Sequence, residues 1–326
     1  MQLQSTVSIN EPSKVIRYND KLIFLGSCFS GNIGNKFVER LFDTTVNPFG
    51  VIFNPVSIFK LLDRSIDKRY FVEDDWQFFN EKWINLDLHG DLSYYTLEEA
   101  LEKSNNLIDE MNEHLNNATH LFLTFGTAWI YEYIEKQQLV ANCHKIPQKE
   151  FEKRLLSVEE IVESGNAILS KLQTANSGLQ TIFTISPVRH LADGAHNNNI
   201  SKSALFLAVD EMIKESGSDY FPSYEIVMDE LRDYRFFDRD FMHPNQLATD
   251  YVWERLLYNW VGEDTVHKVK KVEKVIAAAN HRPFNVESEA HQKFLRKNLS
   301  LIKELSRKAR YLNFDSIKRK FKEQLN

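Results

Sequence analysis

The sequence lacks the features of a membrane protein or a disulfide-stabilised fold. Its 326 residues include two cysteines, Cys28 and Cys143, so no disulfide framework is implied. No apolar run approaches the length that crosses a membrane, and the first 20 residues lack the apolar core of a signal peptide. We therefore expect a soluble, cytoplasmic protein that does not contact a membrane.

The sequence also lacks cysteines and histidines at the spacing that is typical of metal ligands. Cys143 and His144 are adjacent, whereas the ligands of one ion are usually spaced, and no second pair lies near them in the sequence. We expect neither a metal ion nor a cofactor. A chain of this length, without internal repeats or low-complexity segments, can form one large α/β domain with an extension, or two ordinary domains.

Charge is distributed unevenly along the chain, whose net charge is −6. Residues 263–326 hold 16 Lys and Arg against 8 Asp and Glu, whereas the rest of the chain holds 24 against 38. The acidic body is a poor match for nucleic acid, because phosphate contacts need clustered cations, so we expect no nucleic-acid partner. The basic segment is typical of a solvated helical face, and a surface for an acidic partner is the alternative.

Short apolar runs alternate with helical patterns along most of the chain. The runs do not alternate cleanly with polar residues, which is typical of parallel strands buried on both faces. The expected strands are residues 22–25, 44–47, 121–125, 181–185 and 224–227. The expected helices are residues 30–42, 55–62, 97–115, 157–172, 201–216 and 245–261. This order predicts a three-layer α/β/α sandwich around a parallel five-stranded sheet.

Two regions depart from this alternation. Residues 70–96 contain WQFFNEKWINLDLHG, which resembles an inserted hairpin. After Gly262 only basic helical patterns remain, so we divide the chain into a main domain, residues 1–262, and a C-terminal extension, residues 263–326. Apolar residues recur in the extension at helical spacing, so we expect helices that pack on the main domain or across a homodimer. They include Val269, Val272, Leu295, Ile302 and Leu305.

The first expected strand ends on a turn that carries two potential nucleophiles. Residues 22–25 run straight into Gly26-Ser27-Cys28, and ligands of open parallel sheets bind at the carboxyl ends of the strands. Ser27 is either a helix N-cap or a hydroxyl presented to a ligand, and Ser30 is an equally good N-cap. If Ser27 faces the cleft, we expect Cys28 to pack inward, and a nucleophilic Cys28 is the alternative.

The stretch DRDFMHPN, residues 238–245, places Asp240 three residues before His243. Pro244 biases His243 away from helical geometry and suits the first position of the following helix. An Asp so placed can accept a hydrogen bond from one ring nitrogen and leave the other nitrogen as a base. The alternative is a helix-capping histidine beside a surface acid. His243 is the only well-framed base for a hydroxyl at Ser27.

These two motifs occur together with NPFGVIFNP, FGTAWIY, NCHKIP and SPVRH. Together they resemble the GSCFA-domain family of the SGNH (GDSL-like) hydrolase superfamily, over about residues 20–260. Ser30 stands where the family's name has Ala. The resemblance implies a flavodoxin-like sheet of the SGNH type, with Ser27 as the nucleophile, His243 as the base and Asp240 as the residue that orients it.

The resemblance also implies donors for an oxyanion. Ser27 and Gly50 would each supply a backbone N–H, although Gly50 is equally typical of a turn after Pro48. The superfamily usually has Gly-x-Asn-Asp after the third strand, and its Asn donates to the oxyanion. This chain has GTAW at residues 126–129. Either Thr127 contributes its hydroxyl, or another residue replaces the Asn, or the site has fewer donors.

Four residues of the GSCFA-like segments are candidates to fill this gap or to bind the substrate: Asn142, His144, Arg189 and His190. Arg189 could hold a carboxylate or phosphate in a two-pronged contact, and an ordinary salt bridge is the alternative. Asn142 and His144 lie in an expected loop, where they could equally satisfy backbone groups.

These expectations favour a serine esterase or deacylase that acts through a covalent acyl-enzyme on a small-molecule or glycan ester. An O-acyltransferase would use the same Ser27, Asp240 and His243 but hand the acyl group to an alcohol or sugar. The third alternative is a degenerate, non-catalytic glycan-binding module, which the missing Asn favours.

Overall fold

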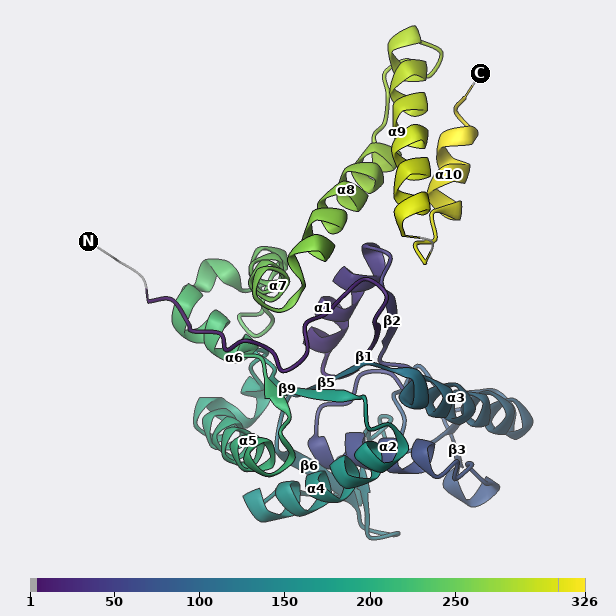
Figure 1. Cartoon of the computed structure of the whole chain (residues 1–326). Helices are drawn as coiled ribbons and strands as arrows, with labels where there is room; N and C mark the ends of the chain where they lie inside the picture. The colour runs from purple at the N-terminus through teal and green to yellow at the C-terminus, as the bar shows by residue number, and fades with distance from the viewer. Residues whose placement is uncertain (1–4, 310, 326) are drawn as a thin grey trace.

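The computed structural model describes residues 5–309 and 311–325, and a five-stranded parallel sheet lies at its centre (Figure 1). The bounds of its strands are Lys21–Gly26 (β1), Asp43–Val46 (β2), His120–Phe125 (β5), Gln180–Ile185 (β9) and Asp219–Tyr220 (β10). Their order in the sheet is β10-β9-β5-β1-β2, which is the flavodoxin-like order. Gly26 pairs with Thr124 and Phe125 pairs with Ile185, so β1, β5 and β9 end level with one another.

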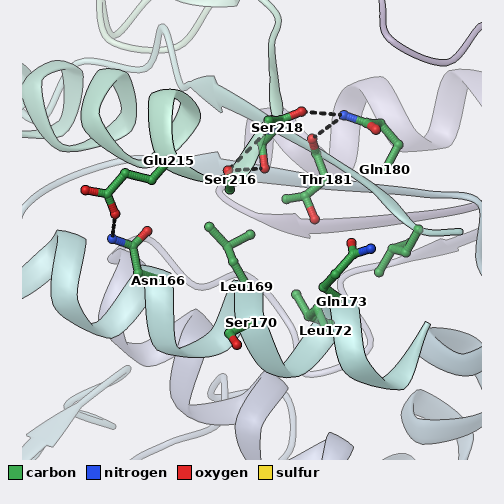
Figure 2. A pocket seen from close by; sticks show the side chains of 12 residues that line it. Asn166, Leu169, Ser170, Leu172, Gln173, Gln180, Thr181, Glu215, Ser216 and Ser218 are labelled. Carbon is green, nitrogen blue, oxygen red and sulfur yellow. Dashed lines mark hydrogen bonds between the residues drawn. The ribbon is translucent and has the colours of Figure 1, made fainter. Parts of the chain in front are cut away.

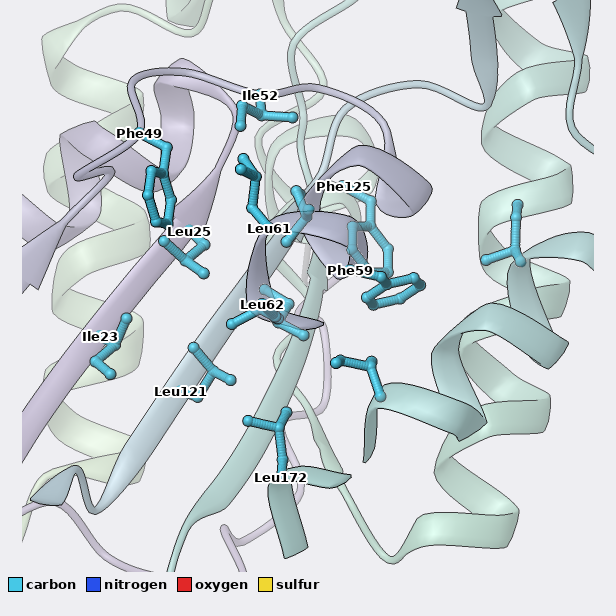
Figure 3. Close-up of a cluster of buried hydrophobic side chains, with 14 of the residues drawn as sticks. Ile23, Leu25, Phe49, Ile52, Phe59, Leu61, Leu62, Leu121, Phe125 and Leu172 are labelled. Atoms are coloured by element: carbon cyan, nitrogen blue, oxygen red, sulfur yellow. The ribbon is translucent and has the colours of Figure 1, made fainter. Parts of the chain in front are cut away.

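Helices cover both faces of the sheet, because alternate strand residues point to opposite sides. Helices α2 to α5 share one hydrophobic core with Ile23, Leu121 and Phe183, part of which is drawn in Figure 3. Helices α1 and α7 share a second core with Leu22 and Phe122. The helices are Cys28–Glu39 (α1), Pro55–Ile66 (α2), Leu97–Asn117 (α3), Val158–Ala175 (α4), Gly194–Ser216 (α5) and Gln246–Trp260 (α7). The predicted three-layer sandwich is therefore confirmed.

Polar side chains set the starts of most of these helices. Asn54, Thr96, Ser157 and Asn245 each accept a hydrogen bond from a first-turn N–H, of α2, α3, α4 and α7 respectively. Helix α1 differs, because its N-cap residue Ser27 makes no such hydrogen bond. The Ser27 hydroxyl is therefore not committed to capping. Short 3-10 helices occupy Glu73–Asp75 (η1), Gln148–Glu150 (η2), Leu191–Asp193 (η3) and Tyr234–Phe236 (η5).

The prediction of a fifth strand at residues 224–227 is wrong. These residues lie in α6 (Ser223–Glu225) and in the π-helical turn η4 (Ile226–Leu231) that follows it. Ile226 and Val227 are fully buried in the core shared by α1 and α7, so their apolar character reflects the packing of a helical turn. The actual edge strand, β10, has two residues, which is too short to give a hydrophobic pattern.

Two small antiparallel sheets are added to the sandwich. Strands β3 (Gln77–Phe79) and β4 (Lys82–Ile84) form the hairpin expected within residues 70–96. A three-stranded sheet in the order β7-β6-β8 was not predicted. Its strands are Trp129–Tyr133 (β6), Gln138–Val140 (β7) and Phe151–Leu155 (β8). Because β6 follows β5 almost immediately, this sheet stands beside the carboxyl edge of the central sheet.

The C-terminal extension forms three helices that project from the sandwich (Figure 1). They are Glu263–Asn280 (α8), Glu289–Lys308 (α9) and Asp315–Lys322 (α10). Buried residues of all three, including Val272, Leu305 and Phe321, belong to the same core as Trp253 of α7. The expected helical packing onto the main domain is thus present at α7. No helix within the described residues is long and apolar enough to cross a membrane.

We predict that Leu305→Ala lowers the free energy of unfolding by about 2–5 kcal/mol, because this side chain is 2% exposed and its loss leaves a cavity in the core of the extension. Urea unfolding followed by circular dichroism measures the change. Lys303→Ala, at an exposed position of the same helix, is the matched control. Equal stability of the two variants would mean that α9 is not held by this core.

Candidate active site

A cavity of about 460 Å³ lies at the carboxyl edge of the central sheet. Its walls come from the turn after β1, the segment before α2, the segments that follow β5 and β9, the β7-β6-β8 sheet and the loop before α7. Six of the residues nominated from the sequence line it: Ser27, Thr127, Asn142, Arg189, His190 and His243. The fold therefore brings segments from six parts of the chain to one place.

Ser27 owes its position to the glycine before it. A Cβ at Gly26 would lie 2.1 Å from the Thr124 carbonyl oxygen, so only glycine lets β1 approach β5 this closely. The Ser27 residue is 1% exposed, and its Oγ has no hydrogen-bond partner among the described residues. Leaving a buried hydroxyl unpaired costs roughly 1–3 kcal/mol, so such a group requires an explanation, for example a catalytic role.

His243 is held by Asp240 as the sequence motif indicates. Its Nδ1 lies 2.6 Å from Asp240 Oδ2, and Asp240 Oδ1 accepts the backbone N–H groups of Met242 and His243. These hydrogen bonds, the backbone ones first, lower the pKa of Asp240 to about 2, so the carboxylate stays ionised near neutral pH. Nε2 of His243 is then the nitrogen available as a base. Helix α7 begins at Gln246, so Pro244 precedes the helix and does not start it.

Ser27 and His243 line the same cavity, but no hydrogen bond joins them. The roles that the resemblance implies would join Ser27, His243 and Asp240 by hydrogen bonds, and this arrangement is formed in part. The Asp240–His243 pair is present, and the contact to the Ser27 hydroxyl is not. Catalytic hydrogen bonds are often long or misaligned before substrate binds, and then tighten in the complex.

Two expected oxyanion donors already have acceptors. The Ser27 N–H donates to the Thr124 carbonyl over 3.2 Å, and the Gly50 N–H donates to the Asn47 carbonyl over 2.8 Å. Gly50 lies outside the 460 Å³ cavity, packed against His89. The expectation for Gly50 is therefore wrong, since its N–H closes a turn. The N–H of Ser27 instead continues the pairing of β1 with β5.

The Thr127 hydroxyl belongs to a small network on the cavity wall. Its Oγ1 accepts the Trp129 N–H over 3.1 Å and lies 3.0 Å from Ser201 Oγ, which in turn accepts the Ala128 N–H over 2.7 Å. If Ser201 donates to Thr127, the proton of Thr127 remains for a ligand. Thr127 therefore stays a candidate donor.

The two candidates from the loop, Asn142 and His144, lie in different places. Asn142 lines the cavity, and its Oδ1 accepts the His144 N–H over 2.8 Å. His144 lies outside the cavity, where its Nε2 is 2.8 Å from the Asn85 carbonyl and 3.0 Å from that of Leu88. Burial lowers the pKa of His144, so the neutral ring ties two chain segments together. The expectation that His144 binds substrate is wrong, because its polar edge is committed to these carbonyls.

Arg189 and His190 both line the cavity. The Arg189 backbone N–H donates to the Met242 carbonyl over 3.1 Å, which joins this segment to the His243 loop. No acidic side chain of the described residues forms a salt bridge with Arg189, so its guanidinium can meet an anionic group of a ligand. His190 Nε2 is buried without a hydrogen-bond partner among those residues.

Cys28 packs inward in part, as expected, since it is half-buried and lies against the core shared by α1 and α7. It also lines the cavity together with Ser27. Burial raises the pKa of its thiol, and this effect outweighs the backbone N–H groups of Phe29 and Cys28 and the cation of Lys202, which favour the thiolate. A protonated thiol is a weak nucleophile near neutral pH. The position of Cys28 is therefore compatible with a nucleophile, but its raised pKa disfavours that role.

Sequence reasoning missed Lys202 of α5, which is 2% exposed. Its Nζ donates to the carbonyls of Gly126 and Ser186, both over 2.6 Å, and so joins the ends of β5 and β9. Burial lowers its pKa to about 7. A pattern could have revealed it, because Lys202 occupies the apolar stripe of α5 three residues before Leu205 and seven before Val209.

A second cavity, of about 430 Å³, lies between α4 and α5 near the start of β9 (Figure 2). Its lining includes Asn166, Gln173, Gln180 and Ser218, and none of the residues nominated from the sequence. No group of three metal-binding side chains occurs within residues 5–309 and 311–325. The cavity at the carboxyl edge is therefore the candidate active site.

We predict an acid-sensitive contribution of His190 to stability. Burial, reinforced by the Lys202 cation, lowers the pKa of His190 to about 4, whereas an unfolded chain titrates near 6.5. Between about pH 6.5 and about pH 4, His190 is protonated in the unfolded state but neutral in the native state. Its contribution to the free energy of unfolding is therefore complete above about pH 6.5 and is lost as the pH falls through about 4. The shift corresponds to about 3 kcal/mol.

Urea unfolding of wild type and His190→Gln at about pH 7 and about pH 4.5 tests this. The stability of the variant relative to wild type should rise at the lower pH, because glutamine does not titrate. His196→Gln, at an exposed position of α5, is the control and should follow wild type. A His190→Gln curve parallel to wild type would contradict the assignment.

Comparison with protein families agrees with the sequence motifs. The model of the GSCFA family matches residues 21–256, and that of the GSCFA domain protein, C-terminal domain, matches residues 272–326. No curated protein matches the chain. The first match includes the turn after β1, the segments after β5 and β9, and the Asp240–His243 loop. On this basis the chain belongs to the GSCFA family.

Proposed function

We propose that the protein is a serine esterase or deacylase of the SGNH (GDSL-like) type, with Ser27 as the nucleophile. One observation carries the proposal. The Ser27 hydroxyl is buried and unpaired in the same cavity as His243, whose other ring nitrogen is bound by an ionised Asp240. A hydroxyl, a neutral base and a carboxylate that orients the base are the components of nucleophilic acyl transfer.

The reaction would proceed in two steps. Ser27 Oγ attacks the ester carbonyl carbon, its proton passes to His243 Nε2, and the carbonyl electron pair moves onto oxygen. Collapse of this intermediate expels the alcohol, which takes the proton from His243, and leaves an acyl group on Ser27. Water, deprotonated by His243, then releases the acid. Asp240 stabilises the imidazolium in both steps.

The cavity suits an ester with an apolar acyl group and a polar alcohol. Ile130 and Val140 supply buried apolar wall. Trp129 and Tyr131 lie on the other face of β6, each with its ring centroid 5.4 Å from Lys153 Nζ. Aromatic rings beside a cation and the guanidinium of Arg189 favour a hydroxyl-rich or anionic partner such as a glycan. A glycan ester is therefore the proposed substrate class.

Two related functions compete with hydrolysis. The occupied N–H groups of Ser27 and Gly50 favour a non-catalytic glycan-binding module, since both expected backbone donors are engaged. The basic C-terminal extension favours an O-acyltransferase, because an acidic acyl carrier could dock on it. The transferase would use the same acyl-enzyme, with an alcohol in place of water.

We predict that Ser27→Ala lowers kcat/KM for a short-chain p-nitrophenyl ester by roughly 10³-fold or more, because the acyl-enzyme cannot form. Cys28→Ala, at the neighbouring residue, is the matched control and should keep most of the activity. A fluorophosphonate probe followed by peptide mass spectrometry should place the label on Ser27. Adding glycan or alcohol acceptors then separates transfer from hydrolysis.

The opposite pattern would reassign the nucleophile. If thiol alkylation abolishes activity in wild type but not in Cys28→Ala, the Cys28 thiol lies in the reaction path. If no ester is turned over, no probe labels Ser27, and a glycan still binds, the protein is a binding module.

A further inference from the structure

The proposed reaction requires a donor for the oxyanion that develops on the carbonyl oxygen. Loss of one such donor typically costs about 10²–10³-fold in rate. In this chain the N–H groups of Ser27 and Gly50 have carbonyl acceptors, and position 128, where the superfamily has its Asn, is Ala128. Candidate donors on the cavity wall include the Thr127 hydroxyl and the His190 ring. The Thr127 hydroxyl already takes part in hydrogen bonds with Trp129 and Ser201, whereas His190 Nε2 has no partner among the described residues.

The ring of His190 lies beside the end of β5 and lines the same cavity as Ser27. Its Nε2 is 3.3 Å from the place of a Cβ at Gly126, directly after β5. The last registered pair of β5 and β1 is Thr124 with Gly26, so Gly126 and Ser27 both follow the ends of neighbouring strands. The imidazole therefore stands at the same strand ends as the proposed nucleophile.

The ring is positioned before any ligand binds. The His190 backbone N–H donates to Asn198 Oδ1 over 2.8 Å, and the ring packs edge-on against Phe53 with 5.6 Å between centroids. Nε2 nevertheless has no partner among the described residues. A buried and unpaired ring nitrogen is the state expected of a donor whose acceptor forms only during the reaction.

Burial, helped by neighbouring positive charge, keeps this ring neutral. The charged and titratable groups that face it are Lys202 of α5, Asp193 of η3, His243 and Lys153 of β8. Burial and the Lys202 cation lower the pKa of His190 to about 4, and Asp193 opposes them. A neutral imidazole can donate one hydrogen bond without adding a second cation beside His243, which becomes positively charged in the reaction.

We propose that His190, in the tautomer with its proton on Nε2, donates the hydrogen bond to the oxyanion and replaces the Asn of the superfamily. This inference rests on the proposed acyl transfer at Ser27. It also agrees with glycine at position 126, since a Cβ there would lie 3.3 Å from Nε2 and would press on the imidazole.

Steady-state kinetics with a p-nitrophenyl ester tests the proposal. His190→Ala should lower kcat by about 10²–10³-fold with little change in KM, because the hydrogen bond forms only in the transition state. His190→Gln, which keeps an N–H donor, should recover part of this loss. His196→Ala, on the exposed face of α5, is the control and should match wild type. If His190→Ala does not fold, His190→Phe keeps the contact with Phe53, removes the donor and should show the same loss.

Binding of phenylboronic acid supplies a readout without turnover. Boron forms a tetrahedral anion on the serine hydroxyl, so His190→Ala should raise its Kd by about tenfold or more, and His196→Ala should leave it unchanged.

The outcomes separate this proposal from the proposed function. Activity that Ser27→Ala abolishes and His190→Ala leaves intact overturns the role of His190 alone. A raised KM with unchanged kcat makes His190 a substrate-binding residue and also overturns it. An absence of ester turnover and of boronate binding in wild type removes the acyl-transfer function and this inference with it.

Discussion

The candidate site depends on the register of the central sheet, in which β1, β5 and β9 end at the same level. Because Gly26 pairs with Thr124 and Phe125 pairs with Ile185, the residues just beyond the three strands lie side by side. A slip of one strand by two residues would move its turn by about 7 Å and would separate Ser27 from the segment that carries His190. The backbone pairing of β1, β5 and β9 therefore determines which segments meet at the cavity.

A buried cation reinforces this register. Lys202 binds the carbonyls that follow β5 and β9, and these hydrogen bonds offset part of the cost of keeping an ammonium group away from water. Its charge also acts on the cavity, since it favours the thiolate of Cys28 and disfavours protonation of His190. The residue that joins the ends of β5 and β9 thus also influences the ionisation of these two side chains, opposing the effect of burial at Cys28 and adding to it at His190.

The sequence predicts the three layers of the fold and two features of the site, the turn after β1 and the Asp240–His243 pair. The apolar runs of β1, β5 and β9 and the spacing of Asp240 and His243 are short-range patterns, and the structure reproduces them. Strand β10 has two residues, which is too few to show a hydrophobic pattern. The apolar pair Ile226–Val227 has the composition of a strand but lies in a helical turn. The turn at Gly50 is closed by Asn47, three residues earlier, and is one of the two readings that the sequence offers. The roles of His144 and Cys28, in contrast, depend on partners distant in sequence, such as the Asn85 carbonyl for His144. Tertiary hydrogen bonding of this kind has no signature in a single sequence.

The β7-β6-β8 sheet has a small hydrophobic cluster of its own, built from Leu86, Tyr133, Val140 and Phe151. Its strands pair only with one another, apart from the central ladder. Ile130 of β6 differs, because it packs in the core that α2 to α5 share with the central sheet. The cavity wall is therefore held by two sets of contacts, one local to the small sheet and one shared with β5 and β9. Substitutions at Val140 can reshape the cavity with less disturbance of the central strands than substitutions at Ile130, so the two positions differ in how freely they can vary.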